Sequence, residues 1–139
     1  MQRFLTAQEA AYPRALAEIK NGQKQSDWMW YIFPQVQGLG FSEQSKYYAI
    51  KDLREARLFL EHPVLGNRLI EISTTLYALE GRTAHQVFGS PDDLKLKSCM
   101  TLFCFLPDAD PVFNAVLDKF FNGVKDHKTL HIISGSANR

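Results

Sequence analysis

The sequence predicts an all-α protein, a compact multihelical single domain over residues 1–139. Three observations lead to this fold class. Residues that start helices recur along the chain, and glycines or prolines follow them where helices end. Apolar residues between these signals recur at intervals of three and four, which is the period of a buried helix face. No segments with alternating polar and apolar residues are placed to pair as strands.

The composition is that of a globular domain. Hydrophobic residues make up 45 % of the chain and charged residues 22 %, which argues against disorder and against a coiled coil. The net charge of +1 is too small for the basic surface of a nucleic-acid-binding domain. No apolar run approaches the roughly 18 to 20 residues that span a membrane, and Glu9 interrupts the N-terminus where a secretory signal would be apolar. We expect a soluble, cytoplasmic protein without nucleic-acid or membrane partners, as a monomer or homodimer.

The first 22 residues are expected to form two short helices. Thr6 and Glu9 have the spacing of a capping box, which starts a helix. Pro13 cannot lie deep inside a helix, so a second helix is expected to begin near it. Gly22 would end that second helix.

The stretch SDWMWYIFPQ, residues 26–35, is the most apolar part of the chain. Ser26 or Asp27 can cap a helical turn here, and Pro34 stops it because the residue before a proline avoids the α region. The following QVQGLGF is expected to be a loop, since it contains two glycines.

The remaining helices follow from start signals and apolar periodicity. The longest is expected to run from Pro63 to about Glu80, with an inner face of leucines and isoleucine. The tail, residues 124–139, is left open between an extended segment and a last short helix, although TLHII favours β structure. Start signals for the helices after the loop lie at Ser42, Asp52, Pro63, Thr83, Ser90 and Asp110.

The aromatic stretch has two interpretations. A helix that is apolar on all sides is either buried in the core or presents one side to a ligand. In the second case the aromatic rings form the wall of a pocket, and the indole N–H groups and nearby amides orient a polar ligand. The candidate ligand-binding residues are Trp28, Trp30, Phe33, Gln35 and Tyr48.

A second candidate site begins the helix after Gly89. Asp92 and Asp93 are adjacent carboxylates, and Lys95 follows them. One acid could act as a general base whose pKa its neighbour raises, while the lysine steadies negative charge. The alternative is that the two acids only stabilise the start of the helix through its dipole. Asp92, Asp93 and Lys95 are the catalytic candidates.

Metal and cofactor motifs are absent from the sequence. The four histidines have no metal-ligand spacing such as HExxH, and there is no GxGxxG or Walker loop. Cys99 and Cys104 are interpreted as two buried free thiols. We therefore expect no metal site and assign no cofactor.

Four blocks of the chain resemble the family known as domain of unknown function 1810. They are WMWYIFPQVQGLGFS, the Tyr48-Ala-Ile segment, EARLFLEHPVLGNRL and FGSPDDLKLKSCMTLF, and the resemblance extends from Arg3 to Gly123. It implies a compact, multihelical bacterial domain without an established activity. The calpastatin label that some members carry deserves little weight, because that inhibitor is disordered whereas this composition is globular.

Three residues depart from the pattern of that family. Asp27 replaces a frequent histidine, Ala49 a common glycine and Cys99 a usual serine. Asp27 can accept a hydrogen bond but cannot do the work of a neutral imidazole. The order of the blocks is also similar to that of helical NADAR-type domains, which remove ADP-ribose-related groups. That similarity rests on layout and residue type alone.

Three functional hypotheses follow. The first is a small-ligand-binding or regulatory domain with the aromatic segment as pocket wall. The second is a small hydrolase of a nucleotide or ADP-ribose-like substrate, acting through Asp92 or Asp93. The third is a homodimeric interaction module that uses surface aromatics. The first is preferred because the sequence contains no complete catalytic set.

Overall fold

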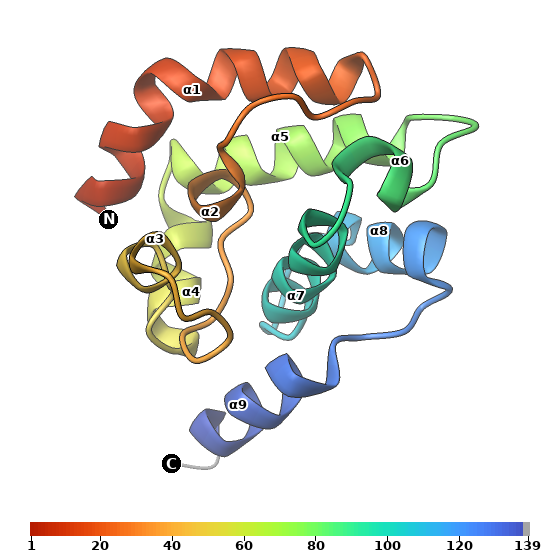
Figure 1. The fold of residues 1–139 in the computed structure, drawn as a ribbon. Coiled ribbons are helices and arrows are strands. Elements are labelled where there is room, and N and C mark those ends of the chain that lie inside the picture. Colours follow the sequence, from red (N-terminus) through yellow and green to blue (C-terminus); the bar gives the residue numbers. More distant parts are fainter. Residues whose placement is uncertain (138–139) are drawn as a thin grey trace.

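The computed structural model describes residues 1–137, which contain nine helices and no strand (Figure 1). This confirms the all-α fold class. No helix in this part of the chain is long and apolar enough to cross a membrane. The helices are α1 (Gln2–Lys20), α2 (Met29–Ile32), α3 (Glu43–Tyr47), α4 (Leu53–Glu61), α5 (Leu65–Tyr77), α6 (Ala84–Phe88), α7 (Asp92–Cys104), α8 (Val112–Phe121) and α9 (His127–Ala137).

The N-terminal segment forms one long helix instead of the two short ones expected. Helix α1 begins at Gln2 and continues through Pro13, and the predicted start at Thr6 lies inside it. Proline removes one backbone hydrogen bond from a helix. Here burial outweighs that loss, because α1 packs along α5 and buries Phe4 and Ile19 completely (Figure 1).

Helix α7 lies at the centre of the domain and contacts α4, α6, α8 and α9 (Figure 1). Its apolar residues are buried on more than one side, which is typical of a central helix. The aromatic rings of Phe103 and Phe113 join α7 to α8, with centroids 5.8 Å apart. Phe103 also contacts Phe59 of α4, at 5.6 Å.

Helices α4 and α5 meet at a tight junction. Asp52 caps α4 as predicted, since its side chain accepts the N–H of Glu55 at 2.9 Å. Helix α5 begins at Leu65, two residues after the expected Pro63. A Cβ atom on Gly66 would lie 1.9 Å from the carbonyl oxygen of Leu60. The glycine therefore permits a backbone approach that no other residue allows.

The tail forms a helix although its sequence favours β structure. Asp126 caps α9 by accepting the N–H of Thr129 at 3.0 Å and its hydroxyl at 2.5 Å. Thr129 and Ile133, which are four residues apart, are fully buried. Packing of this helical face against α7 and α4 outweighs the β preference of the segment.

Candidate functional site

The aromatic stretch is divided between the core and a cavity. Trp28, Met29, Ile32 and Phe33 are almost completely buried around the single turn of α2, so the core interpretation is confirmed for these four residues. The rings of Trp28 and Phe33 both contact Phe88. Trp28 and Phe33 are thus packed in the core, although both were candidate ligand contacts, and neither lines the cavity that contains Trp30.

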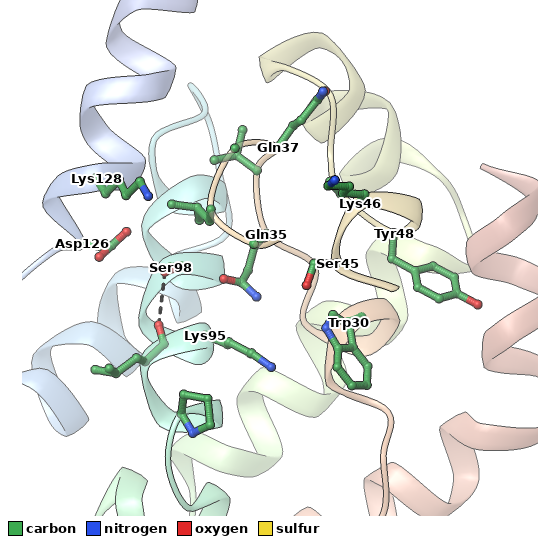
Figure 2. Close-up of a pocket in the computed structure, with 17 residues that line it drawn as sticks. Trp30, Gln35, Gln37, Ser45, Lys46, Tyr48, Lys95, Ser98, Asp126 and Lys128 are labelled. Atoms are coloured by element: carbon green, nitrogen blue, oxygen red, sulfur yellow. Dashed lines mark hydrogen bonds between the residues drawn. The ribbon is translucent and has the colours of Figure 1, made fainter. Parts of the chain in front are cut away.

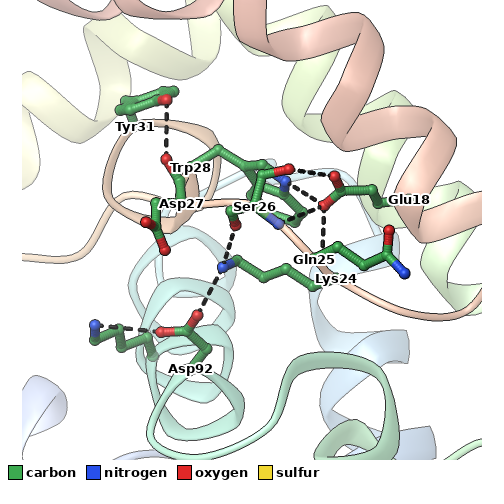
Figure 3. A network of polar contacts seen from close by, with 9 residues as sticks. Glu18, Lys24, Gln25, Ser26, Asp27, Trp28, Tyr31 and Asp92 are labelled. Carbon is green, nitrogen blue, oxygen red and sulfur yellow. Dashed lines mark hydrogen bonds and ion pairs between the residues drawn. The ribbon is translucent and has the colours of Figure 1, made fainter.

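Glu18 of α1 fixes the entry to the aromatic stretch (Figure 3). Its carboxylate accepts the N–H groups of Gln25 and Ser26, the hydroxyl of Ser26 and Nε1 of Trp28, the last at 2.8 Å. Burial disfavours the charged form of Glu18, but these four hydrogen bonds outweigh burial and lower the pKa of the carboxyl to about 2. The charge of Glu18 therefore orients Trp28.

Trp30, two residues further on, lies in the wall of a cavity of about 270 Å³, called the Trp30 cavity below (Figure 2). The loop after Pro34, helix α3 and the beginnings of α7 and α9 surround it. Its polar lining residues are Gln35, Gln37, Ser45, Lys46, Lys95, Ser98, Asp126 and Lys128.

The indole nitrogen of Trp30 has no hydrogen-bond partner among residues 1–137, although the atom is buried. Indole N–H groups usually find a partner when they are buried. Figure 2 shows the polar ends of Gln35, Ser45 and Lys95 directed toward the same space as this nitrogen. The ammonium of Lys95 lies 4.7 Å from the centre of the Trp30 ring. Donors and an acceptor for a polar ligand therefore converge on the Trp30 side of the cavity.

Asp92 contacts Lys24 in the network around Glu18 (Figure 3), and it also pairs with Lys95. Its carboxylate lies 2.9 Å from the ammonium of Lys24 and 3.3 Å from that of Lys95. The side chain of Lys24 is only 7 % exposed, and it also donates to the carbonyl oxygen of Ser26. Asp92 thus neutralises a buried lysine, and it does not line the Trp30 cavity.

Asp93 lies at the start of α7 and outside the Trp30 cavity. It accepts the N–H of Leu94 at 2.9 Å and lies 3.4 Å from Nδ1 of His85. These contacts are those of a residue that begins a helix. A catalytic role of Asp92 or Asp93 stays a prediction, and of the three catalytic candidates only Lys95 faces the cavity.

Two other predicted ligand contacts line the cavity in different ways. The amide of Gln35 points into it (Figure 2). Tyr48 borders it, but its ring turns away, toward Tyr31 and Tyr47 at 5.1 and 4.8 Å. Asp27, which replaces the histidine frequent in related sequences, is exposed and lies outside the cavity.

Sequence reasoning placed Gln35 at the site but missed the glycines of the loop and the tail as parts of it. Gly38 has a φ of +102°, and a Cβ on Gly40 would lie 2.5 Å from Cβ of Ser45, so both glycines shape the cavity wall. Their spacing in QVQGLGF was the available signal. Asp126 and Lys128 carried no such signal, because their place depends on how α9 packs.

The described part of the chain contains no cluster of three or more histidine, cysteine or acidic residues that could hold a metal ion. The polar lining of the Trp30 cavity consists of lysines, amides, hydroxyls, one carboxylate and an indole, groups that can hydrogen-bond to an organic ligand.

Comparisons with known proteins show relatives of this chain. It is similar to the crystal structure of the conserved hypothetical protein Rv1873 from Mycobacterium tuberculosis at 1.38 Å, with 41 % sequence identity and a TM-score of 0.94. The similarity covers 96 % of this chain and 95 % of that one. A search of curated proteins finds no match. The family model described as "Protein of unknown function (DUF1810)" matches residues 1–133, so the chain belongs to this family, as its sequence blocks predict.

Proposed function

We propose that this protein is a small-ligand-binding or regulatory domain whose ligand binds in the Trp30 cavity. The observation that carries the proposal is the buried indole nitrogen of Trp30, which lies at the wall of this cavity and has no partner among residues 1–137. A buried donor without a partner costs about 1–3 kcal/mol. A ligand that offers an acceptor removes this cost in the bound state.

The walls of the cavity support a preformed binding site. Val36 and Ile50 form a parallel backbone bridge that holds the loop. Ser42 caps α3 by accepting the N–H of Ser45. The side chains of Gln35 and Lys95 are partly exposed, so they can move aside to admit a ligand atom to the indole while this backbone stays fixed. Sites for small molecules are usually preformed in this way.

The test uses the indole N–H resonances of the two tryptophans in ¹⁵N-labelled protein. Trp28 donates to Glu18 and serves as the internal control, whereas the Trp30 donor has no partner in the described part of the chain. A panel of neutral, anionic and cationic metabolites is added at about 1 mM, which detects binding of about −4 kcal/mol. We expect some compounds to shift the resonance of Trp30 and leave that of Trp28 in place.

A pair of variants then tests the contact. Trp30→Phe keeps a ring but removes the donor, and should weaken binding of any hit, measured by isothermal titration calorimetry, by about 1 kcal/mol or more. Tyr31→Phe is the matched control, because it removes a donor from the same turn whose partner is the carbonyl of Asp27, outside the cavity. The proposal is wrong if no compound moves the Trp30 resonance, or if both variants bind every hit as tightly as the wild type.

A further inference from the structure

We infer that the ligand of the Trp30 cavity is a small organic anion, the size of an aromatic acid or a monosaccharide phosphate, whose charged group binds beside Lys95. This inference rests on the proposed function and concerns the charge and the size of the ligand. It follows from three features: the charges that line the cavity, the sharing of Asp92 between two lysines, and the volume.

The lining of the cavity carries an excess of positive charge. Three lysines, Lys46, Lys95 and Lys128, face it together with one carboxylate, that of Asp126, which leaves a net charge of +2. Asp126 is engaged by the N–H and hydroxyl of Thr129 at the start of α9. Lys46 and Lys128 form no ion pair within residues 1–137. An anionic ligand would balance this excess, because opposite charges in a cleft attract strongly.

Lys95 is the cation best placed to bind such a ligand at the indole. Asp92 lies closer to Lys24 than to Lys95, at 2.9 Å against 3.3 Å. One carboxylate therefore serves two ammonium groups, and one positive charge is left over. The Lys95 side chain is 24 % exposed, whereas that of Lys24 is 7 % exposed. The surplus charge consequently faces the cavity through Lys95, beside the free donor of Trp30.

The volume limits the size of the ligand. About 270 Å³ equals the space of about nine water molecules in the liquid, and it lies just below the range of roughly 300–1,000 Å³ for drug-sized pockets. A dinucleotide does not fit this space. The side chains of Val36, Leu39 and Leu94 supply apolar walls. A compact molecule with one charged group and an apolar or ring-shaped body matches both the charge and the walls.

The experiment compares anions with neutral molecules of the same shape. Benzoate is paired with benzamide, and ribose 5-phosphate with ribose, and each is titrated to about 10 mM, where a dissociation constant near 1 mM is measurable. The readout is the Trp30 indole resonance, with Trp28 as the internal control. We expect the anion of at least one pair to shift Trp30 while its neutral partner does not. A response to benzoate alone assigns a carboxylate, and one to ribose 5-phosphate alone assigns a phosphate.

Matched lysine variants complete the test. Lys95→Gln should weaken binding of the active anion at least about tenfold, because a hydrogen bond to a charged group is lost. Lys97→Gln is the control, since Lys97 lies on the same helix outside the cavity, 5.9 Å from the ring of Phe121. An unchanged Trp28 resonance in both variants reports an intact core.

Several outcomes would overturn the inference. The first is a shift of the Trp30 resonance that is equally large with the anion and with its neutral partner. The second is equal affinity of the Lys95→Gln and Lys97→Gln variants for the anion. The third is the absence of any Trp30 shift with both anions. In each case the proposed function is judged separately, by the wider metabolite panel. If only neutral or cationic compounds of that panel bind, the proposed ligand-binding function is retained and the inference of an anionic ligand is wrong.

Discussion

The charge of Glu18 should contribute measurably to the stability of the fold, and the substitution Glu18→Gln removes that charge with little change in shape. Four donors from Gln25, Ser26 and Trp28 hold the carboxylate and lower its pKa from an ordinary 4.5 to about 2, against the opposing effect of burial. At 1.36 kcal/mol for each pH unit, this difference corresponds to about 3 kcal/mol. Glu18→Gln should lower the free energy of unfolding by about this amount at pH 7.

The pH dependence follows from the direction of the shift. A carboxyl whose pKa is lowered in the folded state adds stability above its unfolded pKa, and this stability is lost as the pH falls through the folded pKa. The difference in the free energy of unfolding between wild type and Glu18→Gln should therefore have its full size above about pH 5. With a folded-state pKa of about 2 for Glu18, this difference should fall to about 1.4 kcal/mol at pH 3 and nearly vanish at about pH 2.

The assay is urea unfolding, followed by the fluorescence of Trp28 and Trp30, at pH 7, 5 and 3. Glu9→Gln is the control, because Glu9 is exposed on the same helix. Its free energy of unfolding should match that of the wild type within about 0.5 kcal/mol at every pH. An unfolding free-energy difference for Glu18→Gln that is the same at pH 7 and pH 3 would refute the reasoning.

Three further predictions concern packing, capping and thiol chemistry. Gly66→Ala should destabilise the fold by about 3 kcal/mol or more in urea unfolding, because its Cβ would lie 1.9 Å from the carbonyl oxygen of Leu60. Gly135→Ala, where no atom lies within 4 Å, should instead raise the unfolding free energy by about 0.5–1 kcal/mol; a similar loss for both glycines would contradict this explanation. Thr83→Ala removes the capping box of α6. It should lower the free energy of unfolding by about 1 kcal/mol, which is measured as a lower midpoint in thermal unfolding. Burial raises the pKa of the Cys99 thiol, so a thiol reagent at pH 8 should label this residue only after denaturant is added. Peptide mass spectrometry separates Cys99 from the partly buried Cys104, and labelling of Cys99 in the native protein would contradict this explanation.

The candidate site was only partly predictable. Trp30, Gln35 and Lys95 were identified from residue type and all face the cavity. Trp28, in the same aromatic run, is buried in the core. Both tryptophans lie in one helical turn, and which of them faces the core depends on the direction in which α1, α6 and α7 cover that turn. Distant contacts of this kind leave no local signature.

The sequence by itself determined the all-α class and most helix starts. The caps at Ser42, Asp52 and Thr83 are present as predicted, because a capping side chain bonds to a backbone N–H only two or three residues away. Only the tertiary structure decided that α1 continues through Pro13 and that the tail becomes α9. In both cases buried apolar area, supplied by helices far away in the sequence, outweighs a local preference of about 1–3 kcal/mol.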